Sequence, residues 1–261
     1  MIGIFDSGVG GLTVVKSIIE QIPGYSIIYF GDTARTPYGT KSHETVVRYT
    51  LKAADFLMDK GAQVIVMACN TASSVAFESV KKRYDLPVFE VISPAVDLSI
   101  EKTRNNHIGV IGTRATINSC VYEQKIKKSS PPAKVYSYPC PLLVPLVEEG
   151  WFNKPETRMI VKKYLQPLKV RQIDTLILGC THYPLLTKII QRKMGKQVNI
   201  IDSSLAVAKE VKQFLAAHPG LDNKMDKKGD EIFFVSDITP QFEKTANMIL
   251  RKKIFLEQGV T

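Results

Sequence analysis

The chain has 261 residues, of which 44% are hydrophobic and 23% charged, and its formal net charge is +10 at pH 7. This composition predicts a globular protein with enough apolar material for one large domain or two smaller ones. Because no apolar run approaches the roughly 18 residues of a membrane span, and the N-terminal segment lacks the basic start of a secretory signal, we expect a cytoplasmic protein without membrane contact.

The first ninety residues alternate between short apolar runs and longer amphipathic stretches. We expect strands at residues 2–5, 27–30, 64–68 and 88–91, and helices at residues 12–20, 43–60 and 73–84. Ser42 is placed to cap the second helix. A long loop that contains Tyr38 and Gly39 precedes it.

The same scheme repeats further along the chain. We expect strands at residues 108–111, 135–138, 175–178, 198–201 and 232–235, and helices near 115, at 142–149, at 156–165, from 185, at 205–217 and at 240–250. Ser93 and Pro94 mark a candidate hinge between two similar halves. Such alternation predicts an α/β fold with mainly parallel sheets flanked by helices.

Two short passages share one pattern. Cys69, Asn70 and Thr71 follow the expected strand at 64–68, and Cys180, Thr181 and His182 follow the one at 175–178. Carboxyl ends of parallel strands are where α/β folds place their chemistry. We therefore predict two free thiols on opposite sides of one substrate, whereas Cys120 and Cys140 are interpreted as small buried structural residues.

A pair of opposed thiols suits the inversion of a carbon centre. A thiol has a pKa of about 8.5, which a helix N-terminus or a positive neighbour lowers, so a thiolate is available as a base. One thiolate removes the Cα proton of an amino acid, and the opposite thiol delivers a proton to the other face. Such a reaction requires neither a metal nor an organic cofactor.

Polar residues near the thiols are candidate partners in this chemistry. Asn70, Thr71 and Thr181 offer hydrogen bonds to the developing carboxylate charge. Asp6 is a candidate to pair with the substrate ammonium group or to take up its proton. His182 is placed to tune Cys180, either as a proton relay or as a nearby charge.

Glycine-rich segments offer competing interpretations. Gly8, Gly10 and Gly11 follow a strand, and Asp32 ends the next one, but Thr13 occupies the third glycine position of a dinucleotide fingerprint. We expect no nicotinamide cofactor. The glycines either aim backbone amides at a ligand carboxylate, with Asp6 and Ser7 facing the same ligand, or form an ordinary turn capped by Asp6.

Two other ligand classes are not expected. The pair Cys180 and His182 lacks a second pair of zinc ligands at a suitable spacing, so no metal is expected. The positive charge is compatible with nucleic-acid binding. The basic residues, however, form scattered groups near expected helix ends, where they complement the helix dipole, so we do not expect nucleic acid as a partner.

Four blocks taken together resemble glutamate racemases. They are residues 5–13, 29–39, 68–72 and 178–185, and further similarity occurs at 111–116 and 145–148. The resemblance runs in order from Met1 to about Ser203. It implies a cofactor-independent enzyme that interconverts L- and D-glutamate and supplies D-glutamate for peptidoglycan. A related aspartate or hydantoin racemase is the alternative, since one methylene group changes binding by only about 1–3 kcal/mol.

The resemblance also implies roles for individual residues. Cys69 is the base that acts on D-glutamate and Cys180 the base that acts on L-glutamate, with Glu148 or the adjacent Glu149 assisting near the second thiol. The implied substrate contacts are Asp6, Ser7, Tyr38, Gly39, Asn70, Thr71, Thr181 and His182.

The fold implied by the resemblance has two pseudo-symmetric α/β domains with the active site at their interface. We expect a discontinuous first domain of residues 1–92 plus 205–261 and a second domain of residues 93–204. Family members are commonly dimers, so a homodimer is a further expectation.

Overall fold

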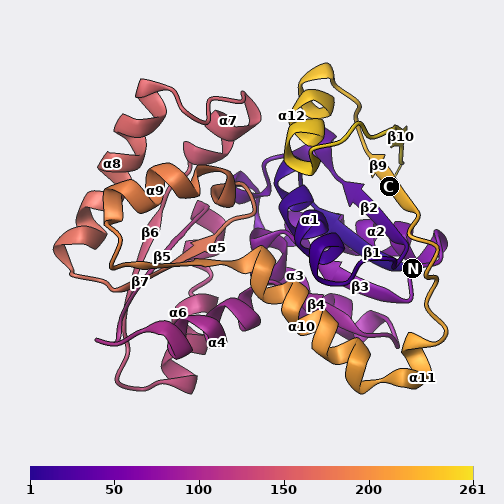
Figure 1. Cartoon of the computed structure of the whole chain (residues 1–261), viewed down its shortest axis with the longest axis horizontal. Coiled ribbons are helices and arrows are strands. Elements are labelled where there is room, and N and C mark those ends of the chain that lie inside the picture. Colours follow the sequence, from indigo (N-terminus) through magenta and orange to yellow (C-terminus); the bar gives the residue numbers. More distant parts are fainter. Residues whose placement is uncertain (261) are drawn as a thin grey trace.

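The computed structural model describes residues 1–260 and contains two parallel β-sheets with helices on both faces (Figure 1). The six-stranded sheet has the order β10-β9-β2-β1-β3-β4. Its strands are β1 (Ile2–Asp6), β2 (Ile27–Gly31), β3 (Val64–Met67), β4 (Val88–Glu90), β9 (Glu231–Val235) and β10 (Leu256–Gln258). The four-stranded sheet has the order β6-β5-β7-β8. Its strands are β5 (His107–Gly112), β6 (Lys134–Pro139), β7 (Thr175–Gly179) and β8 (Asn199–Asp202). The predicted fold class is confirmed.

The two sheets share one topology. In the larger sheet β1 lies between β2 and β3, with β4 beyond β3; in the smaller sheet β5 lies between β6 and β7, with β8 beyond β7. Each sheet therefore grows first to one side of its initial strand and then to the other. Ligands of parallel α/β sheets bind next to this reversal, at the carboxyl ends of the strands. Strands β3 and β7 are topologically equivalent, and Cys69 and Cys180 follow them.

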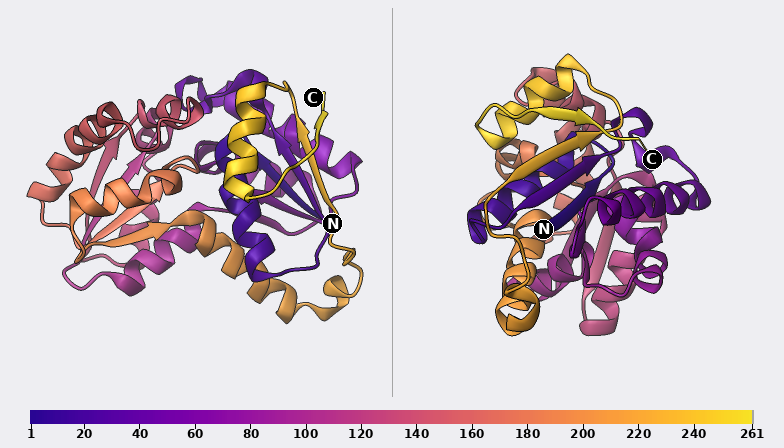
Figure 2. Two further views of the ribbon diagram at one scale, coloured as in Figure 1. Left: turned by 45° about the horizontal axis from the view of Figure 1, so that its top comes forward. Right: turned by 90° about the vertical axis from the view of Figure 1, so that its right-hand side faces the viewer.

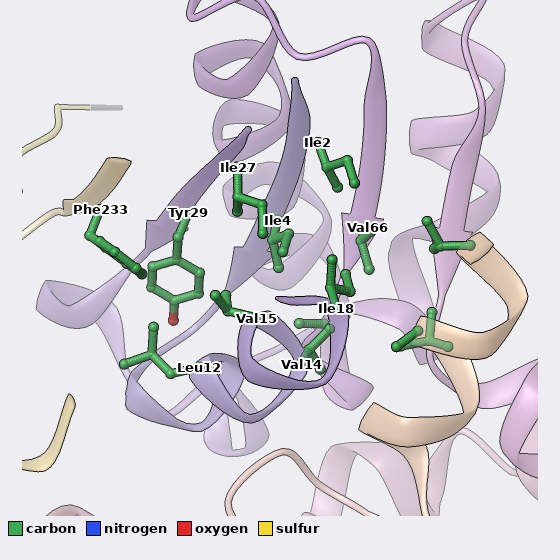
Figure 3. Packing of buried hydrophobic residues seen from close by; sticks show 14 of the residues in the cluster. Ile2, Ile4, Leu12, Val14, Val15, Ile18, Ile27, Tyr29, Val66 and Phe233 are labelled. Atoms are coloured by element: carbon green, nitrogen blue, oxygen red, sulfur yellow. The ribbon is translucent and has the colours of Figure 1, made fainter. Parts of the chain in front are cut away.

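Alternating side chains of the larger sheet supply two apolar cores, because successive residues of a strand face opposite sides. Ile2 and Ile4 pack with α1 (Leu12–Gln21), α10 (Ser203–Ala217) and α12 (Pro240–Leu250). Figure 3 shows these strand residues facing Val14 and Ile18 of α1. On the opposite face, Phe5 packs with α2 (His43–Asp59) and α3 (Asn70–Arg83).

The smaller sheet is covered in the same way. Leu176 and Leu178 pack with α7 (Leu143–Glu148), α8 (Pro155–Val170) and α9 (Thr187–Met194). Ile177 packs on the other side with α4 (Ile92–Lys102) and α6 (Val121–Ser129). The short helix α5 (Arg114–Asn118) follows β5. Rigid sheets covered on both faces thus support the loops at their carboxyl ends.

Two helices join the halves. Helix α4 leads from the larger sheet and packs on β7 and β8, and α10 contacts both α1 and α4. In two views α10 begins between the halves and extends along the larger half, and the last segment of the chain returns to the larger sheet (Figures 1 and 2). That segment contains α11 (Pro219–Asp222), β9, α12 and β10. The domain boundaries at residues 92 and 204 stay a prediction.

Several expected elements differ from those observed. The helix after Cys69 begins at Asn70 rather than near residue 73, and residues 92–102 form a helix where we expected only a hinge. Pro94 is compatible with α4 because the first-turn amides have no intrahelical acceptor. Strand β10 and helix α11 were not expected.

Cys120 differs from its prediction as well. It joins α5 to α6 in the left-handed region, with φ of 56°, and its side chain is exposed rather than buried. The single helix expected near residue 115 is therefore two helices with a sharp turn between them. Cys140 is buried, as predicted. Ser42 caps α2 by accepting a hydrogen bond from the amide of Thr45, which confirms that prediction.

Candidate active site

A small cavity lies where loops from the two sheets meet. Its lining comes from both halves: Ser7, Pro37, Tyr38, Gly39, Cys69, Asn70 and Thr71 from the first, and Thr113, Val144, Cys180, Thr181 and His182 from the second. The structure therefore brings together both candidate thiols and seven further predicted residues. Two predicted residues, Asp6 and Glu148, are not among the described lining residues. Asp6 contacts Thr181 and Glu148 contacts His182, and both of these partners line the cavity.

Cys69 lies in an environment that keeps its proton in place. It precedes the first turn of α3, and its thiol donates a hydrogen bond to Ser7 Oγ over 3.5 Å. Burial and the negative charge of Asp6 raise the pKa of Cys69 to about 12. We had expected the helix N-terminus to lower this pKa, but desolvation outweighs that effect. At neutral pH Cys69 is therefore a thiol, ready to give a proton.

Cys180 has a different set of neighbours. Its Sγ lies 3.7 Å from His182 Nδ1, and His182 Nε2 lies 2.6 Å from Glu148 Oε1. Burial by itself lowers the pKa of His182, but the hydrogen bonds to Cys180 and Glu148 and the charge of Glu148 raise it well above 6.5. His182 is thus an imidazolium that places a positive charge beside the second sulfur. Glu149, the neighbouring alternative, is the C-terminal cap of α7, one residue after the last helical residue.

Asp6 anchors the glycine turn beneath the cavity. Its Oδ2 accepts hydrogen bonds from the amides of Gly8 and Gly11, at 2.9 and 3.0 Å, and its Oδ1 accepts one from Thr181 Oγ1 at 3.2 Å. Of the two interpretations left open above, the capping role is the one these contacts support. Burial raises the pKa of Asp6 to about 6, although His182 and the hydrogen bonds oppose the increase.

The hydroxyl of Tyr38 is bound by Asp32, the acidic residue that occupies the position expected in a dinucleotide-binding fingerprint. The Tyr38 hydroxyl donates to Asp32 Oδ2 over 2.5 Å, and Asp32 Oδ1 accepts from Ser236 Oγ at 2.9 Å. Arg35 lies 3.4 Å from the same carboxylate. Asp32 is fully buried, and its carboxylate oxygens are bound by side chains of the protein itself.

Hydroxyl groups from both halves meet at the cavity. Thr71 Oγ1 lies 2.9 Å from Thr113 Oγ1 and 3.2 Å from Thr116 Oγ1, and the last two lie 3.0 Å apart. Each hydroxyl has one proton to donate and accepts as well. Such a cluster can redirect its donors to a carboxylate. We did not single out Thr113 and Thr116 because their proximity to Thr71 depends on how the halves pack.

Two glycines permit this close packing of the halves. A Cβ atom on Gly10 would lie 2.4 Å from Thr181 Oγ1, and one on Gly39 would lie 2.4 Å from Thr113 Cβ. Any side chain at either position would overlap these threonine side chains of the other half and force a shift in the packing. The glycine turn after β1 thus serves as a close interface between the halves.

Within residues 1–260, no group of three or more His, Cys, Asp or Glu side chains is arranged to hold a metal ion. None of the helices in the same range combines the length and apolar character that a membrane crossing needs. The cavity instead offers two thiols, an imidazolium and several hydroxyl donors, a set suited to moving protons at an anionic substrate.

Comparison with known proteins gives a consistent result. Residues 2–211 match the family model described as Asp/Glu/Hydantoin racemase. The chain is 48% identical to a glutamate racemase of Persephonella marina, over 98% of this chain and 96% of the relative. It is 46% identical to one from Aquifex aeolicus, over 97% of this chain and 95% of the relative.

Solved structures agree in fold. A glutamate racemase of Bacillus anthracis superposes with a TM-score of 0.94 at 38% identity, over 100% of this chain and 97% of that one. A glutamate racemase of Francisella tularensis in complex with D-glutamate superposes with a TM-score of 0.91 at 38% identity, over 100% and 96%. The aspartate racemase of Picrophilus torridus, 19% identical over 85% of this chain and 94% of that one, with a TM-score of 0.55, shares the fold alone.

Proposed function

Because this chain belongs to the Asp/Glu/hydantoin racemase family and is an amino-acid racemase, we propose that it interconverts L- and D-glutamate by proton transfer at Cα. One observation carries the proposal. Two buried thiols, Cys69 and Cys180, follow equivalent strands of two sheets and line one cavity. Glutamate is favoured over aspartate because the relatives that match nearly the whole chain at 41–48% identity are glutamate racemases.

The surroundings of the two thiols differ, and this difference supports one order for the two proton transfers. Cys69 holds its proton, whereas Cys180 lies beside the positively charged His182. In this form Cys180 acts as the base and takes the Cα proton of L-glutamate. Cys69 then donates its own proton to the opposite face, which yields D-glutamate. The enzyme is left with Cys180 protonated and Cys69 ionised, the form that acts on D-glutamate.

Negative charge spreads from Cα onto the substrate carboxylate during the reaction. Hydroxyl groups of Thr71, Thr113 and Thr181 face the same cavity and can donate hydrogen bonds to that charge. Fixed donors of this kind commonly supply a large share of catalysis. Since the proton moves between carbon and sulfur, the mechanism calls on no cofactor.

The wider role follows from the same proposal. D-Glutamate made by this enzyme would supply peptidoglycan synthesis. We place the enzyme in the cytoplasm, because all four cysteines are free thiols and structural disulfides belong to oxidising compartments. The homodimer stays a prediction.

Racemisation of L-glutamate in deuterium oxide tests the proposal. The unmodified chain should lose optical rotation without added cofactor and should incorporate solvent deuterium at Cα. Cys69→Ser and Cys180→Ser should each lose racemisation by about a thousandfold, since both proton transfers are needed. Cys120→Ser is the matched control, because this thiol is exposed and lies on the surface. Parental activity in either cavity variant would exclude the two-thiol mechanism, and faster turnover of aspartate would exclude glutamate as the substrate.

A further inference from the structure

The amide of Asn70 has one satisfied end and one free end. Its Nδ2 donates a hydrogen bond to the Tyr122 hydroxyl over 2.9 Å. Its Oδ1 is buried and has no hydrogen-bond partner within the described part of the chain. Asn70 as a whole is only 2% exposed, and it lines the cavity next to Cys69. Since a buried carbonyl without a donor is unfavourable, the free oxygen points to a ligand that supplies one.

Tyr122 is itself firmly placed. It lies on α6 of the second half, is 2% exposed, and packs in the apolar cluster between α4 and the smaller sheet. A Cβ on Gly179 would lie 3.1 Å from Tyr122 Cε2, so the ring reaches the backbone immediately before Cys180. Burial raises the pKa of Tyr122, and the hydroxyl stays neutral. A fixed neutral hydroxyl is a suitable acceptor for the Asn70 amide.

We propose that Tyr122 is a positioning residue: by accepting the hydrogen bond from Asn70 Nδ2, it turns Asn70 Oδ1 toward the cavity to receive an N–H of the substrate ammonium group. The inference rests on the proposed glutamate racemase function. Amide oxygens accept and amide nitrogens donate, so the anchor decides which end the substrate meets. The only N–H groups of glutamate are those of its ammonium, and the threonine hydroxyls remain available for its carboxylates.

Tyr122→Phe removes the anchor and keeps the ring. Asn70 is then free to rotate, and its NH₂ group competes for the position of the ammonium. We expect KM to rise about tenfold for both glutamate enantiomers, as for the loss of one hydrogen bond to a charged group, while kcat changes less than twofold. Because the enantiomers have equal free energies, kcat/KM must fall by the same factor in both directions.

Two comparisons separate positioning from mere packing. Tyr183→Phe removes another buried hydroxyl, which donates a hydrogen bond of 2.9 Å to the Cys140 carbonyl. Neither residue lines the cavity, so this variant should leave KM unchanged. Asn70→Ala should raise KM as Tyr122→Phe does, and the double variant should add nothing. Additive effects of the two substitutions, or an unchanged KM in Tyr122→Phe, would overturn the inference. Absence of racemisation by the unmodified chain would instead reject the proposed function.

A measurement on the unmodified chain keeps the inference testable if Tyr122→Phe does not fold. The side-chain NH₂ of Asn70, assigned in NMR spectra by its loss in Asn70→Ala, should exchange with deuterium at least tenfold more slowly than that of the exposed Asn223. Equal exchange rates would show that the anchor does not form and would overturn the proposal.

Discussion

Replacing Asp6 by asparagine should change how stability depends on pH. Burial raises the pKa of Asp6 from its usual 3.8 to about 6. Each pKa unit corresponds to about 1.4 kcal/mol between protonation states, so ionising this buried carboxyl makes folding about 3 kcal/mol less favourable than ionising it in the unfolded chain. Asparagine preserves the shape: its oxygen can accept from Gly8 and Gly11, and its NH₂ can face Thr181.

The sign of the effect follows from proton binding. Between pH 4 and 6 the folded chain keeps the Asp6 proton and the unfolded chain has lost it, so the contribution of Asp6 to stability falls as pH rises. The contribution of Asp6 to stability is complete when the pH lies below the pKa of this carboxyl in the unfolded chain, 3.8, and it is lost once the pH passes the pKa in the folded chain, about 6. The free energy of unfolding of the parent minus that of Asp6→Asn should therefore drop by about 3 kcal/mol between pH 3 and 7.

Urea unfolding at half-unit intervals of pH measures this difference. Asp174→Asn is a control with the opposite sign. Burial raises the pKa of Asp174, but hydrogen bonds from Thr103 and from the amides of Arg104 and Asn105 outweigh burial and lower it. Its contribution is therefore lost only as pH falls below about 4, and its difference curve should be flat from pH 5 to 7. A flat curve for Asp6→Asn over pH 4–7 would refute the argument that burial controls this carboxyl.

Two further substitutions test the surroundings of the thiols. Glu148→Gln removes the charge that helps to raise the pKa of His182, so the imidazolium should lose its proton at lower pH than in the parent. As a result, kcat/KM for L-glutamate at pH 8 should fall by about tenfold. An unshifted pH profile of kcat/KM would contradict this role of Glu148. Gly10→Ala places a Cβ 2.4 Å from Thr181 Oγ1 and should reduce kcat/KM by about a hundredfold through misplacement of the halves. Gly220→Ala, which has open space around its Cβ position, is its control; equal activities of the two variants would refute the packing argument.

Local patterns were sufficient for the fold class and for the two thiols. An apolar run followed by a cysteine places that thiol at the carboxyl end of a strand, whatever the rest of the chain does, because strand direction and the βα turn are short-range features. The pattern therefore located Cys69 and Cys180, and the residues next to them, at the carboxyl ends of strands in two parallel sheets, where they line one cavity. Element ends were less certain, as with α4, because a proline in a first turn resembles a break.

Contacts between the halves were decided by the tertiary structure. Asn70 meets Tyr122 across 52 residues of sequence, and Thr181 meets Asp6 across 175. No periodicity or spacing encodes such pairs, since they depend on how two sheets pack around α4 and α10. The protonation state of Cys69 was likewise decided by the tertiary structure. The position of this thiol at a helix N-terminus predicts a low pKa, but burial and the charge of the neighbouring Asp6 raise the pKa instead. Short-range patterns thus determined which groups lie at the carboxyl ends of the strands, whereas long-range packing determined which groups face one another and in which charge state.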